Sequence, residues 1–185
     1  MLNKITIYEV YIAICFVFVS FLMDSSHAQS ADNFLNYTNN DLKFTIQHPS
    51  NWLVVEDEKS SHNRVSFKVS DRIMPIFVVQ IHKVEPYNDT EMMSLKNTLQ
   101  QYVQERQDLL SSLDIDYNPV RQNNVTVGGN FGLKVEFTVG NFFTSDIFTI
   151  ANGKLFELSY HDDPQSLSQN VKLAEKMVDS FQVIK

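Results

Sequence analysis

The chain has 185 residues, of which 43% are apolar and 12% aromatic, so it can bury a core and does not have the composition of a disordered protein. Its 22 acidic and 15 basic residues give a net charge of −7, which argues against binding to nucleic acid through clustered Lys and Arg. The single cysteine excludes a disulfide framework and a zinc site built from several thiolates.

The N-terminus has the pattern of a secretory signal peptide. Lys4 supplies a positive charge, residues 11–23 are uninterruptedly apolar, and Ser26 and Ala28 are small residues at the −3 and −1 positions of a signal-peptidase site. A retained membrane anchor is the alternative, but this apolar block would span only about 20 Å as a helix. We therefore expect a signal peptide over residues 1–28, cleavage after Ala28, and an exported protein in an extracellular, periplasmic or cell-surface location.

After a polar lead-in over residues 29–40, alternating apolar residues predict a series of short strands. Leu42, Phe44 and Ile46 share one face of the first strand, which ends at Pro49. Residues 52–55 and 65–69 continue the series. Residues 76–81 are rich in β-branched side chains, which is typical of a central strand covered on both faces.

Residues 91–113 change period and predict a long amphipathic helix, because apolar side chains recur three, four or seven positions apart. Arg106 interrupts this apolar stripe, and we expect its stem to lie along the helix while its charged head reaches water. The alternation then returns over residues 133–139, 147–150 and 155–160, with Asn152-Gly153 as a hairpin turn.

Asp163 and Pro164 have the residue types of an N-cap and a first helical turn, so they predict the start of a closing helix. The apolar face of that helix runs from Leu167 to Phe181. Taken together, the elements predict an α+β fold in which residues 41–185 form a single domain. Its central antiparallel sheet should carry a helix on each face, since that arrangement buries every apolar stripe.

Four segments resemble the PsbP-like domain family in sequence and order. They are the strand and turn from Tyr37 to Trp52, the Val127-Gly128-Gly129 turn, the hairpin from Phe148 to Tyr160, and the closing residues Met177 to Phe181. The resemblance spans residues 34–184, and it implies a three-layer α-β-α sandwich around an antiparallel sheet. Because the chain has neither an Arg/Ser-rich transit peptide nor a lipobox, we expect an exported prokaryotic member.

The resemblance also implies a class of function. The family includes photosystem II extrinsic subunits and a nuclear-import factor that binds a small GTPase, so it suggests a non-catalytic binding or accessory scaffold. We expect a protein or envelope component as partner, with peripheral membrane association left open, and no nucleic acid. An accessory role in the oxygen-evolving complex of photosystem II rests on the resemblance alone. The oligomeric state stays open.

His161, Asp162 and Asp163 form the densest group of potential metal ligands. Since they follow a strand and open a helix, we expect the carboxylates to cap the helix. A site for calcium or another divalent cation is the alternative, and it would need further ligands from His48, His82 or Glu157. We assign no catalytic, cofactor-binding or metal residue, although a metal-dependent or hydrolytic exported enzyme stays the alternative function.

Two further features concern the surface. Asn36, Asn88 and Asn124 each begin an Asn-X-Thr sequon, which an exported protein can present for glycosylation. Phe142 and Phe143 follow the turn at Gly140 as an aromatic pair. We expect one of these rings to enter the core and the other to pack beneath a helix, with an exposed partner site as the alternative.

Overall fold

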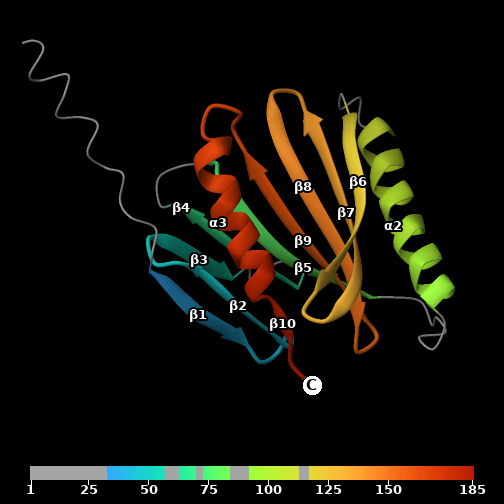
Figure 1. The fold of residues 1–185 in the computed structure, drawn as a ribbon, viewed down its shortest axis with the longest axis horizontal. Coiled ribbons are helices and arrows are strands. Elements are labelled where there is room, and N and C mark those ends of the chain that lie inside the picture. The colour runs from blue at the N-terminus through green and yellow to red at the C-terminus, as the bar shows by residue number, and fades with distance from the viewer. Residues whose placement is uncertain (1–32, 57–62, 70–72, 84–91, 113–116) are drawn as a thin grey trace, which may run out of the picture. The chain divides into compact units, whose positions relative to one another are not determined.

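The computed structural model describes residues 33–56, 63–69, 73–83, 92–112 and 117–185 (Figure 1). The predicted signal peptide, its cleavage site after Ala28 and the sequon at Asn88 lie outside these residues. Residues 33–185 form one compact unit, and the description below concerns this unit. Among the described residues, no helix is both long and apolar enough to cross a membrane.

A seven-stranded antiparallel sheet forms the centre of the described domain (Figure 1). The order across the sheet is β3 (Trp52–Glu56), β4 (Arg64–Val69), β5 (Ile76–Lys83), β9 (Lys154–Asp162), β8 (Phe142–Ala151), β7 (Asn130–Val139) and β6 (Tyr117–Val127). Hairpins join neighbours from β6 to β9, and β9 pairs with β5 from the first half of the chain. At the β8–β9 turn Asn152 and Gly153 have φ of 51° and 71°, which confirms the predicted Asn-Gly hairpin.

Two helices cover opposite faces of this sheet within the described residues. Helix α2 (Met92–Ser112) packs on Phe148, whereas α3 (Leu167–Ser180) belongs to the core that contains Ile147. Since Ile147 and Phe148 are neighbours on β8, their side chains point to opposite sides. The two helices therefore lie on opposite faces of the sheet, as predicted. The helix predicted over 91–113 is confirmed as α2, within one residue at each end.

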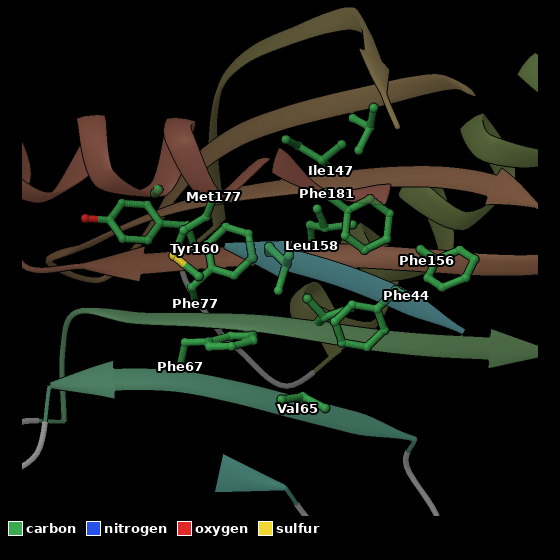
Figure 2. Close-up of a cluster of buried hydrophobic side chains, with 14 of the residues drawn as sticks. Phe44, Val65, Phe67, Phe77, Ile147, Phe156, Leu158, Tyr160, Met177 and Phe181 are labelled. Atoms are coloured by element: carbon green, nitrogen blue, oxygen red, sulfur yellow. The ribbon is translucent and has the colours of Figure 1, made fainter. Parts of the chain in front are cut away.

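The larger core lies beneath α3 and is dominated by phenylalanine. Figure 2 shows Met177 near Tyr160 and Phe77, and Phe181 near Phe44 and Phe156. Phe181 stacks on Phe44 with ring centroids 5.7 Å apart and meets Phe156 edge-on at 5.6 Å. These contacts fix the end of α3 against the sheet, since aromatic pairs add to the stabilisation from buried area.

A second sheet of three strands modifies the expected architecture. Its order is β1 (Phe34–Asn39), β2 (Phe44–Pro49) and β10 (Gln182–Val183), with β1 and β10 both antiparallel to β2. The predicted polar lead-in thus contains a strand that the sequence did not indicate, because its apolar residues Phe34, Leu35 and Tyr37 do not alternate. The structure confirms a mainly antiparallel α+β domain, but the α3 side is built from a helix together with a small sheet. The predicted three-layer α-β-α sandwich is therefore not confirmed.

Candidate functional site

The segment 161–163 does not form the cluster of ligands that its sequence suggests. His161 and Asp162 are neighbours on β9, so their side chains lie on opposite faces of the sheet. Asp162 is 0% exposed and accepts hydrogen bonds from the hydroxyls of Tyr160 and Ser166, both at 2.6 Å. Its carboxylate also accepts bonds from the Asn170 amide and from the backbone N–H of the next residue, at 3.2 Å and 2.8 Å.

The structure corrects the predicted helix start. Asp163 caps a preceding turn, since its Oδ1 accepts the Gln165 N–H at 2.8 Å, while α3 itself begins at Leu167 with Ser166 as the N-cap. Ser166 donates its hydroxyl to Asp162 and makes no side-chain cap bond within α3. The capping prediction therefore placed the helix three residues too early, because Asp-Pro is equally suited to a turn. The buried anchor of this segment is Asp162.

On the α2 face, charged groups gather in what we call the Arg106 cluster: His82, Arg106, Asp146, Glu157 and Ser159. His82 Nε2 donates to Glu157 Oε2 at 2.6 Å, and the Ser159 hydroxyl donates to Oε1 at 3.2 Å. Arg106 Nη2 lies 3.5 Å from Glu157 Oε1. The Arg106 head, expected in water, thus turns toward a carboxylate whose side chain is only 4% exposed.

Asp146 is the least satisfied member of the Arg106 cluster. It is 0% exposed, and neither of its carboxylate oxygens has a hydrogen-bond partner in the described part of the chain. Burial, together with the charge of Glu157, raises the pKa of Asp146 to about 7, against the opposing effects of the Arg106 charge and of the nearby Ser159 hydroxyl, whose hydrogen bond goes to Glu157. Burial alone would also raise the pKa of Glu157, but the hydrogen bond from His82 and the charge of Arg106 lower it instead.

His161 lies near this cluster but makes a separate contact. Its Nδ1 is 3.0 Å from the Thr144 hydroxyl, and it shares with Arg64, Arg106 and Glu157 a polar hollow of about 260 Å³. Burial and the positive charge of Arg106 lower the pKa of His161 to about 4, so its ring is neutral at pH 7 and a weak base. In the described residues no three His, Cys, Asp or Glu side chains are placed to hold a metal ion.

The opposite face carries a larger hollow, which we call the α3 pocket. It lies between α3 and strands β5 to β9, with a volume of about 430 Å³. Phe77, Phe143, Ile147, Leu158, Tyr160 and Val178 are among its apolar lining residues. Its polar lining consists of Thr126, Lys134, Glu136, Ser145, Glu175 and Asp179. The pocket exists because α3 packs on β2 and β9 and leaves the adjacent part of β6, β7 and β8 without a helix above it.

The other residues singled out in the sequence lie apart from both sites. His48, in the small sheet, packs its ring on Phe67 and donates from Nδ1 to the carbonyl of Pro49, and burial lowers its pKa. Asn36 and Asn124 are exposed on strands β1 and β6, as glycosylation would require. Phe142 is 42% exposed, whereas Phe143 turns inward to the α3 pocket, so the aromatic pair is divided as expected but the outer ring faces solvent.

The sequence suggested His82 and Glu157 only as further ligands for a metal bound at residues 161–163. In the structure these two side chains instead bind each other. The sequence did not single out Asp146, because Thr-Ser-Asp inside a strand gives no sign of a buried carboxylate. The α3 pocket was equally hidden, since its walls come from segments up to about a hundred residues apart in the sequence. Only the alternation of Lys134 and Glu136 with apolar neighbours could have placed those two charges on a shared face.

Solved structures with this fold come from several bacteria. The solution structure of cyanobacterial PsbP (CyanoP) from Synechocystis sp. PCC 6803 has a TM-score of 0.62 and 15% identity, covering 86% of this chain and 97% of that one. The crystal structure of LpqN, involved in cell envelope biogenesis of Mycobacterium tuberculosis, has a TM-score of 0.55 and 9% identity, covering 83% and 91%. No protein-family model and no curated protein matches the sequence.

The described residues thus form an α+β domain built on an antiparallel sheet, with one helix on each face and the α3 pocket between α3 and the sheet. This chain has the PsbP-like fold, as its sequence segments suggested. At these identities the likeness establishes the fold, and function has to be argued from the site.

Proposed function

We propose that this protein is an exported, non-catalytic binding domain that serves as an accessory to an envelope component, and that it binds in the α3 pocket. The observation that carries the proposal is the pocket itself. Its volume of about 430 Å³ falls in the range of small-molecule sites, about 300–1,000 Å³, and such sites combine an apolar lining with a few polar groups.

The location in the proposal comes from the sequence and agrees with one of the solved structures. Residues 1–28 have the pattern of a signal peptide, and LpqN, which shares the fold, is described as involved in cell envelope biogenesis. An accessory role in photosystem II, as in PsbP relatives, would also be carried out by an exported protein. The α3 pocket supplies no argument for it, so we propose the general binding role.

The electrostatics do not support the alternative of a hydrolytic enzyme. The one described hydroxyl–histidine contact that could serve as nucleophile and base is Thr144 with His161. A base should have a pKa near the working pH, whereas that of His161 is lowered to about 4. Ser159 is likewise engaged, since it donates to Glu157, a carboxylate that is already paired with His82.

A fluorescent apolar probe tests the proposal directly. N-phenyl-1-naphthylamine should brighten on binding to the protein, and Val178→Trp, which places a large ring in the α3 pocket, should abolish that signal. Leu109→Trp is the matched control, because Leu109 is 53% exposed on α2 at the opposite face. A circular-dichroism melt establishes that each variant is folded, and Val171→Trp replaces Val178→Trp if the latter unfolds. Probe binding that survives a filled pocket in a folded variant would contradict the proposal.

A further inference from the structure

The charges around the α3 pocket indicate what kind of ligand it takes, provided that it is the binding site proposed above. Its polar lining includes three carboxylates and one lysine. Lys134 Nζ lies 2.7 Å from Glu136 Oε1, and Arg121 Nε lies 3.8 Å from the other oxygen of the same carboxylate. The charge of Glu136 is therefore already compensated by the protein.

Glu175 and Asp179 are different, because neither has an ion-pair partner within the described ranges. They are four residues apart on α3 and line the same side of the pocket. The last turn of α3 contains no basic residue, so the partial negative charge of the helix C-terminus adds to that of Asp179. The rim of the pocket consequently carries two carboxylates that have no ion-pair partner among the described residues.

A third polar group lies deeper in the pocket. Ser145 is 8% exposed and lines the hollow from β8, and its hydroxyl has no hydrogen-bond partner among the residues that the structure describes. The nearby Tyr160 hydroxyl is not free in this way, because it donates to Asp162. A buried hydroxyl that faces a cavity can orient a ligand with one hydrogen bond.

Aromatic rings complete the lining. Phe77, Phe143 and Tyr160 reach the same hollow as the two carboxylates. Ring faces attract cations, so aromatic side chains beside unpaired carboxylates favour a positively charged group that also has apolar surface. An anionic ligand would meet repulsion from the two carboxylates at the rim, and an uncharged one would gain nothing from their charge.

We propose that the α3 pocket binds a small amphipathic cation. The apolar part packs on the floor formed by Ile147 and Leu158, and the cationic group lies at the rim beside Glu175 and Asp179. The pocket volume of about 430 Å³ lies in the range of small-molecule sites, so we assign a small molecule and not a segment of a protein.

Calorimetric titration with three probes of equal chain length tests this assignment. Decyltrimethylammonium, decanol and decanoate are each titrated below the concentration at which they aggregate. We expect the cation to bind at least about tenfold more tightly than decanol, and decanoate to bind most weakly. Raising the ionic strength should weaken the binding of the cation and leave the affinity for decanol unchanged, because salt screens only the interaction between charges.

The double variant Glu175→Gln/Asp179→Asn removes both charges and preserves the shape of the side chains. It should reduce the affinity for decyltrimethylammonium by about tenfold or more without changing that for decanol. The matched control is Glu105→Gln/Asp108→Asn, which makes the same change of charge on exposed residues of α2 and should alter neither affinity.

The outcomes separate this inference from the proposed function. Equal binding of cation and decanol, blocked by Val178→Trp, would overturn the cationic ligand and leave the pocket as a binding site. Failure of all three probes and of the naphthylamine to bind would overturn both. Tighter binding of the peptide acetyl-Leu-Lys-Leu-amide than of decyltrimethylammonium would overturn the small molecule in favour of a basic protein segment.

Discussion

Arg106 Nε lies 3.8 Å from Asp146 Oδ2, so the guanidinium of α2 faces a carboxylate that is 0% exposed but does not complete a hydrogen bond to it. A single long contact with a guanidinium that is itself 34% exposed cannot fully offset the cost of removing the Asp146 charge from water. Asp146 therefore holds its proton more strongly than a carboxyl group in solution. We therefore expect the packing of α2 on β8 to depend on pH.

The first prediction concerns Asp146→Asn. The pKa of this carboxyl rises from 3.8 to about 7 on folding, so its contribution to stability is complete below pH 3.8 and is lost as the pH rises through about 7. The asparagine of the variant does not ionise. The free energy of unfolding of the variant, relative to that of the wild type, should therefore increase between pH 4 and 8, by up to about 4 kcal/mol. Urea unfolding across this range measures the gain. Asp108→Asn, an exposed control, should show none.

The second prediction has the opposite sign and concerns His161→Gln. The pKa of His161 falls from 6.5 to about 4 on folding, so its contribution is present above pH 6.5 and is lost as the pH falls toward 4. The variant should therefore become more stable relative to the wild type as the pH is lowered through this interval. A difference in free energy of unfolding that is independent of pH would show that folding does not change the pKa of His161.

The third prediction is that Trp52 is structural. Trp52 is 4% exposed at the start of β3, which confirms the assignment to the core, and Trp52→Ala should destabilise the protein by about 3–5 kcal/mol. Its neighbour Leu53 is 48% exposed, so Leu53→Ala should cost far less. Thermal unfolding of both variants decides the point. Equal effects would place Trp52 at the surface.

The fourth prediction distinguishes Asp162 from Asp163. Asp162→Ala leaves Tyr160, Ser166 and Asn170 without their common acceptor and should lower stability by about 3 kcal/mol or more. Asp163→Ala removes one bond in a turn and should cost about 0.5–2 kcal/mol. Neither change should depend on Ca²⁺ or Zn²⁺ in a thermal-shift titration with EDTA. A metal-dependent rise in the melting temperature that either variant abolishes would restore the metal-site hypothesis.

The fifth prediction concerns export. The pattern of Ser26 and Ala28 after the apolar block predicts a mature N-terminus at Gln29. N-terminal sequencing of protein recovered from outside the cytoplasm measures this directly. Recovery of chains that begin at Met1 would contradict cleavage and favour a retained anchor.

The sequence by itself determined the features that depend on local patterns. The stripe that includes Leu99 predicts α2, and Asn152-Gly153 predicts the β8–β9 hairpin, because helix periodicity and positive φ are set by neighbours along the chain. The order of the segments that resemble the PsbP-like family is likewise a property of the sequence alone. These features together indicated an α+β fold with an antiparallel sheet.

Only the tertiary structure decided which charged groups meet and where a cavity remains. Arg106 interrupts the apolar stripe of α2 and its charged head was expected in water, yet the packing of α2 over β8 brings that head to Asp146 and Glu157. The α3 pocket depends on where α3 crosses the sheet, which Phe181 fixes through its contacts with Phe44 and Phe156. These relationships join residues that are distant in sequence, and their energies depend on burial and on distances that no local pattern encodes.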